Sequence, residues 1–204
     1  KPVSSATSMT FNPASATDFT LFVRIPEWAE GTSVAVNGKA ATGVAKQGEY
    51  FAVKRNWQAG DKVRLSLPMT PRLILANQLV RENVGRVAVE RGPLVYCLEQ
   101  HDYPGAESIF DATLPVSATP AREFKSEFLA DKLGGIVVLR HPGIARAQSL
   151  TQEPLYRQLE TAKRKDTGRQ VELTFIPYYA WANREPTSMQ VWIPYTQVPD
   201  AGGK

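Results

Sequence analysis

The sequence predicts an all-β protein made of two consecutive antiparallel β-sandwich domains of the jelly-roll-like type. Three observations predict this fold class. Apolar and polar residues alternate with a period of two along most of the chain, turn-forming sequences separate these segments, and prolines fall near the segment ends. We expect the first domain, truncated at its N-terminus, to span residues 1–84 and the second to span residues 85–204.

The first part of the chain shows the clearest strand and turn signals. In Phe19–Ile25 the odd-numbered residues are apolar and would face a core, and in Asp61–Leu67 three apolar residues alternate with polar ones. One face of each segment is therefore expected to face water, as in antiparallel sheets. Between Ser33–Val36 and Lys39–Ala41, the dipeptide Asn37-Gly38 predicts a type I′ hairpin turn.

Strand patterns continue beyond these segments. They are predicted at Tyr50–Lys54, Arg86–Glu90, Leu94–Glu99, Gly135–Arg140, Val171–Ile176 and Met189–Ile193. The stretch Ala121–Leu133 is ambiguous, because its apolar residues fit one helix face as well as an alternating strand. We favour a strand followed by a turn at Leu133-Gly134-Gly135.

Composition and charge narrow the function classes. The 204 residues carry a net charge of +4 with a pI near 9.2, but the cations are dispersed. Lys163-Arg164-Lys165 is the one basic run, so we expect no nucleic-acid partner. No apolar run approaches the roughly 20 residues that cross a bilayer, and residues 1–10 lack the apolar core of a signal peptide. Because the chain begins with Lys1, we expect an excised or processed piece.

The residues that carry acid–base or nucleophilic chemistry form no familiar motif. Cys97 is the only cysteine, which excludes an intrachain disulfide and a cysteine-based zinc site within the chain. It lies in an apolar segment, where we expect a buried, protonated and inert thiol. The two histidines, His101 and His141, lie in no recognisable triad sequence, and no Gly-x-Ser-x-Gly elbow occurs.

Two acidic residues, Glu90 and Glu99, flank the Arg91-Gly92-Pro93 corner. Sugar hydrolysis uses two carboxylates about 5–10 Å apart, so this pair is the nearest approach to such a site. We favour structural pairing of these acids with Arg86 or Arg91. We therefore predict no catalytic residue and no metal ligand in this chain.

Aromatic residues after Pro177 form the remaining candidate site. Tyr178, Tyr179 and Trp181 could stack on the C–H faces of a sugar, but large aromatics also fill cores and domain interfaces. We keep these three as candidate ligand-binding residues and favour a core or interface position for Trp28 and Trp57.

Several segments in one order resemble the region after the catalytic barrel in the β-L-arabinofuranosidase family, glycoside hydrolase family 127. The most specific is Gly85–Glu99, with the sequence GRVAVERGPLVYCLE. The others are Leu21–Trp28, Val34–Gly38, Trp57–Asp61, Leu65–Met69, Ile176–Arg184 and Val191–Pro194. Together they span nearly the whole chain.

The resemblance implies an (α/α)6 catalytic barrel followed by two β-sandwich domains, of which this chain supplies the sandwiches. Family members hold a cysteine nucleophile beside a zinc ion in the barrel, so we expect no cofactor here and no catalytic role for Cys97. The expected partners are the chain's own barrel domain, glycans and a second copy of the protein. A periplasmic or secreted location is favoured over a cytoplasmic one. Without the barrel, we expect the chain to expose an apolar patch.

Overall fold

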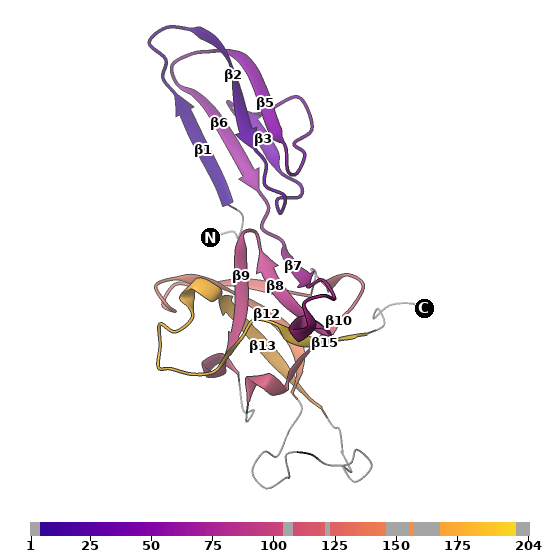
Figure 1. Ribbon diagram of the computed structural model, residues 1–204. Helices are drawn as coiled ribbons and strands as arrows, with labels where there is room; N and C mark the ends of the chain where they lie inside the picture. Colours follow the sequence, from indigo (N-terminus) through magenta and orange to yellow (C-terminus); the bar gives the residue numbers. More distant parts are fainter. Residues whose placement is uncertain (1–4, 104–107, 121–122, 146–155, 157–167, 199–204) are drawn as a thin grey trace, which may run out of the picture. The chain divides into compact units, whose positions relative to one another are not determined.

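The computed structural model describes residues 5–103, 108–120, 123–145, 156 and 168–198, so the basic run 163–165 lies outside the described residues. The described part of the chain is mostly β, with 53% of its residues in strands and 8% in helices. No described helix is long and apolar enough to span a bilayer. The chain forms two compact units, Lys1–Thr70 and Pro71–Lys204 (Figure 1).

The first unit contains two antiparallel sheets. One has four strands in the order β1-β6-β3-β4, and the other consists of β2 and β5. The bounds of these strands are β1 Ser5–Phe11, β2 Thr17–Arg24, β3 Ser33–Val36, β4 Lys39–Ala40, β5 Tyr50–Trp57 and β6 Asp61–Leu67.

The core of the first unit includes most of the positions that the alternating pattern predicts, but Phe19, also predicted to face the core, is 37% exposed. Val23 near the end of β2, Ile25 just after it, and Val63 and Leu65 of β6 are buried together with the fully buried Trp57. The core position predicted for Trp57 is therefore confirmed. The β3–β4 hairpin is confirmed too, because Asn37 and Gly38 both have the positive φ angles, 50° and 79°, that a type I′ turn requires.

The second unit consists of the following elements, given in chain order. They are β7 Pro71–Leu75, η1 Arg81–Asn83, β8 Arg86–Arg91, β9 Leu94–Glu99, η2 Gln100–Asp102, η3 Ile109–Asp111, β10 Ala112–Val116, β11 Lys125–Leu129, β12 Ile136–Ala145, β13 Arg169–Pro177, η5 Tyr178–Ala180, β14 Met189–Gln190 and β15 Ile193–Gln197. The second unit begins at Pro71, whereas a boundary after residue 84 was predicted from the sequence. The difference arises because β7 pairs with β8 along its whole length.

Six strands of the second unit close into a barrel. The ring runs β9-β13-β12-β10-β15-β8, and the β8–β9 hairpin joins its ends. All pairings in the ring are antiparallel except β10–β15, which is parallel. The prediction of two β-sandwich domains is therefore wrong. Closure of the barrel depends on pairings between strands far apart in sequence, which local alternation cannot reveal.

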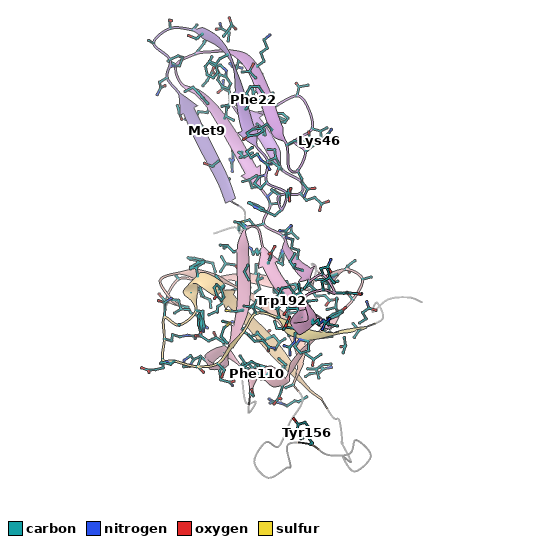
Figure 2. The ribbon with its side chains drawn as sticks, in the orientation of Figure 1. Met9, Phe22, Lys46, Phe110, Tyr156 and Trp192 are labelled. Carbon is teal, nitrogen blue, oxygen red and sulfur yellow. The ribbon has the colours of Figure 1, made fainter. Side chains whose placement is uncertain are left out.

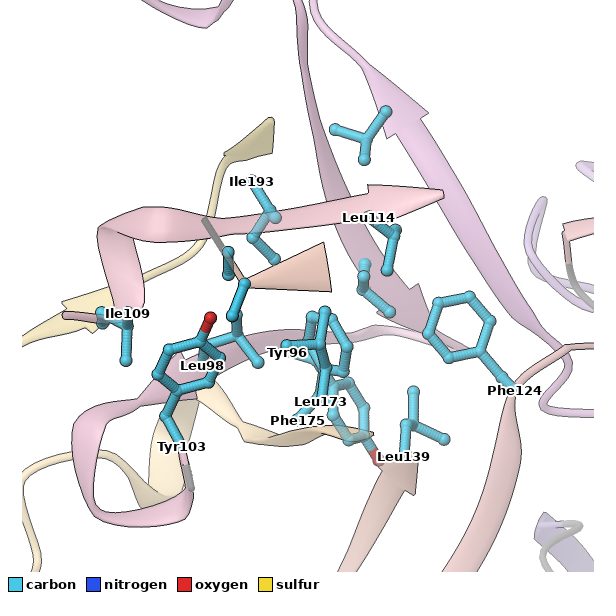
Figure 3. Packing of buried hydrophobic residues seen from close by; sticks show 14 residues of the cluster. Tyr96, Leu98, Tyr103, Ile109, Leu114, Phe124, Leu139, Leu173, Phe175 and Ile193 are labelled. Carbon is cyan, nitrogen blue, oxygen red and sulfur yellow. The ribbon is translucent and has the colours of Figure 1, made fainter. Parts of the chain in front are cut away.

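The barrel is filled by side chains rather than hollow (Figure 3). Tyr96 and Leu98 of β9 point inward, whereas Cys97 between them joins a second cluster with Ile136 and Ile176. Strand β9 is therefore buried on both faces, which explains its almost continuous apolar sequence.

The ambiguous stretch resolves as a strand over its central part. Lys125–Leu129 is β11, which pairs with β12 in antiparallel fashion, and a turn follows at residues 133–135. Leu133 has a φ of 50°, and both following glycines are also in the left-handed region. The strand interpretation is thus confirmed, while residues 121–122 lie outside the described part.

Candidate functional site

Four charged side chains form a polar cluster in the second unit, on the outer face of β9. Glu99 ends β9, Asp102 ends η2, Lys132 lies in the turn after β11, and Arg184 follows η5. Arg184 donates hydrogen bonds to both carboxylates, with 2.7 Å from its Nη2 to Asp102 Oδ2, and Lys132 also donates to Asp102. We call these four residues the ion cluster.

The ion cluster is well suited to holding the fold together and poorly suited to catalysis. Its two carboxylates face two cations, so the charges balance. Glu99 is 1% exposed, and a charged carboxylate buried to that extent destabilises the fold unless a cation is paired with it. The cluster therefore ties the end of β9 to two connections that lie far away in the sequence.

Cys97 lies beside this cluster, and its thiol is expected to be unreactive. Its side chain is fully buried. Burial, together with the nearby Asp102 carboxylate, raises the pKa of the Cys97 thiol to about 12. A thiol with that pKa stays protonated near neutral pH, so the prediction of an inert core cysteine is confirmed.

A cavity of about 290 Å³ opens next to the ion cluster, but its charged lining residues are already paired. It is lined by His101, Asp102, Lys132, Arg140, Glu172 and Thr174. Arg140 Nη1 lies 2.8 Å from Glu172 Oε1, and His101 Nε2 lies 2.8 Å from the Glu185 carbonyl oxygen. The histidine thus donates to the backbone.

His141 borders a second cavity, of about 470 Å³, and its ring is also engaged in contacts within the chain. Its ring is buried beside Phe124. Nδ1 lies 2.6 Å from the Pro142 carbonyl oxygen, and Nε2 lies 3.0 Å from Glu123 Oε2. With both nitrogens facing oxygen atoms of the protein, the ring is held as a structural element.

The acids Glu90 and Glu99 do not face each other across a cleft. Glu90 pairs across the hairpin with Val95, four residues before Glu99, so their backbones are about 13 Å apart at roughly 3.3 Å per residue. Each acid has an arginine partner, Arg72 at 2.8 Å for Glu90 and Arg184 for Glu99. The expectation of structural pairing is confirmed, with Arg72 and Arg184 as the partners in these two salt bridges.

The aromatic candidates lie together around η5. Tyr178 and Trp181 stack with ring centroids 5.9 Å apart and an angle of 22° between the planes. Tyr178 is 45% exposed and Tyr179 is 63% exposed, whereas Trp181 packs partly against the cluster around Cys97. Ala180, which is buried, anchors this turn to the barrel.

The described residues contain no group of three or more His, Cys, Asp or Glu side chains able to hold a metal ion. Lys132 and Arg184, the two cations of the ion cluster, were not predicted from the sequence. Their signal was indirect: Glu99 stands at the end of an otherwise apolar strand, and a buried acid of this kind requires a cation from elsewhere in the chain.

Comparison with known proteins identifies both units. Residues 71–194 match the glycoside hydrolase family 127 C-terminal domain, and residues 1–69 match the β-L-arabinofuranosidase GH127 middle domain. A non-reducing end β-L-arabinofuranosidase of Bifidobacterium longum subsp. longum is 38% identical over 185 residues, which cover 88% of this chain and 27% of that protein.

Solved structures agree with these sequence matches. A GH127 β-L-arabinofuranosidase from Geobacillus stearothermophilus T6 superposes with a TM-score of 0.78 at 36% identity, over 96% of this chain and 29% of its own. A second structure, described as a glycoside hydrolase, gives a TM-score of 0.79 at 32% identity, over 94% of this chain and 30% of its own. The chain thus spans less than a third of the length of these relatives. It belongs to glycoside hydrolase family 127, within which it corresponds to the middle and C-terminal domains.

Proposed function

We propose that this chain is the non-catalytic accessory region of a β-L-arabinofuranosidase-like glycoside hydrolase. One observation carries the proposal: the candidate acids Glu90 and Glu99, the two histidines and the single cysteine are each engaged in structural contacts. Glu90 and Glu99 are held by arginines, His141 faces two oxygen atoms, and the pKa of Cys97 is about 12. In this proposal the region packs against a catalytic barrel and stabilises it.

The zinc implied by the family resemblance does not fit this chain. Cys97 is the only cysteine and is buried beside a charge-balanced cluster, and the described residues offer no three-ligand group. We therefore assign zinc binding and sugar cleavage to the rest of the polypeptide, and derive no catalytic step here.

The test compares two proteins on p-nitrophenyl β-L-arabinofuranoside with and without added zinc. One is the 204-residue chain, and the other is the product of the same reading frame extended upstream. We expect p-nitrophenol release from the extended protein alone. Turnover by the purified 204-residue chain that survives chelation and repeated purification would refute an accessory role.

The exposed tyrosines favour a second candidate function, the binding of a glycan through Tyr178, Tyr179 and Trp181. A sugar could stack on the exposed Tyr179 ring beside the stacked Tyr178–Trp181 pair. Calorimetry with arabinan oligosaccharides tests this, using Tyr179→Ala against Phe110→Ala as a matched control, because Phe110 is 57% exposed (labelled in Figure 2). Binding that is lost only in Tyr179→Ala supports the second function, and equal heats for both variants exclude it.

A further inference from the structure

The connection between β7 and β8 presents an unusual number of aliphatic side chains to solvent. Leu75, at the end of β7, is 64% exposed, and Leu79, Val80 and Val84 are 88%, 43% and 63% exposed. Four of the ten residues from 75 to 84 are therefore large, apolar and exposed. Scattered single apolar residues are normal on a protein surface, but a concentration of this kind marks an interaction site.

This connection is an ordered structure. The Val80 amide donates to the Asn77 carbonyl oxygen at 2.9 Å, and the Asn83 amide donates to that of Val80 at 3.1 Å. The Asn77 side chain accepts a further hydrogen bond from the Leu79 amide, also at 2.9 Å. The backbone is thus fixed by its own hydrogen bonds, while the aliphatic side chains remain exposed to a large degree.

Strand β7, which leads directly into this connection, provides a second and independent indication. It is the last strand of its sheet and pairs only with β8 among the described strands, so its other edge is open. Its sequence after Arg72 is Leu-Ile-Leu, with neither lysine nor an inner proline to discourage pairing with another chain. Natural proteins normally cover or blunt such an edge.

We propose that the β7–η1 surface, formed by the open edge of β7 with Leu75, Leu79, Val80 and Val84, is the docking site for the polypeptide that precedes the middle domain. This inference rests on the proposed function. The relatives are more than three times longer than this chain. Because the matched regions are the middle and C-terminal domains, the remaining length of a full family member lies on the N-terminal side.

Hydrogen–deuterium exchange in the 204-residue chain and in the upstream-extended protein tests the proposal. Amides of residues 73–84 are expected to exchange at least tenfold more slowly in the extended protein. Leu79→Asp should abolish this difference, because it places a charge in the docked surface. Val44→Asp is the matched control: Val44 is 80% exposed in the first unit, and its replacement should leave the protection unchanged.

The outcomes separate this inference from the proposed function. Equal exchange of residues 73–84 in both proteins, with the extended protein active, would overturn the docking site and leave the accessory role standing. Protection that instead appears in the 204-residue chain as its concentration rises would make the surface a self-association interface, which also overturns the proposal. An extended protein without glycosidase activity counts against the proposed function, whatever the exchange shows.

Discussion

At the residue scale, Cys97 offers the most direct chemical test of the structure. Its full burial and a pKa of about 12 mean that almost no thiolate exists at pH 8. We expect Ellman's reagent to leave the native chain unmodified at that pH and to titrate one thiol per chain in guanidinium chloride. Rapid reaction of the native protein would show that Cys97 is exposed or activated.

Among the residues of the ion cluster, Arg184 is the one whose replacement should lower the free energy of unfolding most. Replacing it with alanine leaves Glu99, at 1% exposure, without a partner for its charge, which typically costs about 3–5 kcal/mol of unfolding free energy. Urea denaturation measures the effect. Adding Glu99→Gln should restore part of the loss, because it removes the unpaired charge.

A second arginine–glutamate salt bridge, which is more exposed to water, provides the control for this experiment. Arg72 and Glu90 form a salt bridge of 2.8 Å, but their side chains are 42% and 24% exposed. Water screens this pair, so Arg72→Ala should cost about 0–1 kcal/mol. If Arg72→Ala and Arg184→Ala destabilise the protein equally, burial is not the cause of the effect.

At the element scale, Asp61 fastens β6 to two neighbouring segments of the first unit. Its carboxylate accepts hydrogen bonds from the Asn37 side chain of the β3–β4 hairpin at 2.7 Å, from the Gln58 amide at 2.9 Å and from Arg55 of β5. These contacts, above all that with Asn37, lower the pKa of Asp61 below 3.8. The folded unit therefore favours the charged carboxylate.

The pH dependence follows from the sign of this shift. The stabilising contribution of Asp61 is fully present above the unfolded value near 3.8 and is lost as the pH falls through the lower folded value. We expect the melting temperature of the first unit to fall between about pH 5 and pH 2, and the fall to be shallower in Asp61→Asn. Circular dichroism melts of both proteins test this; parallel curves would contradict it.

The elements that could be predicted from sequence are those whose signal is local. The Asn37-Gly38 hairpin and β9, Leu94–Glu99, follow from turn chemistry and from a continuous apolar run. The barrel could not be predicted in this way, because its closure requires β15 to pair with β8 and β10, which lie about 80–110 residues away from it. The cations of the ion cluster were missed for the same reason, since Arg184 meets Glu99 across 85 residues.

At the scale of the whole molecule, the two units have separate hydrophobic cores. The buried cluster of the first unit draws all its members from residues before Thr70, and the two clusters of the second unit draw theirs from residues after Pro71. Because hydrophobic stabilisation comes from apolar area buried within each cluster, each unit should carry its own cooperative unfolding transition.

Two core substitutions test this independence. Val63→Ala removes buried volume from the first core, and Leu139→Ala removes it from the barrel; both residues are 0% exposed. Leu→Ala changes in cores typically cost about 2–5 kcal/mol. In urea titrations followed by resolved NMR signals from each unit, Val63→Ala should shift only the transition of residues 5–70, and Leu139→Ala only that of the second unit. A single transition that both variants shift equally would show that the two cores unfold as one, and that residues 71–204 need the middle domain in order to fold.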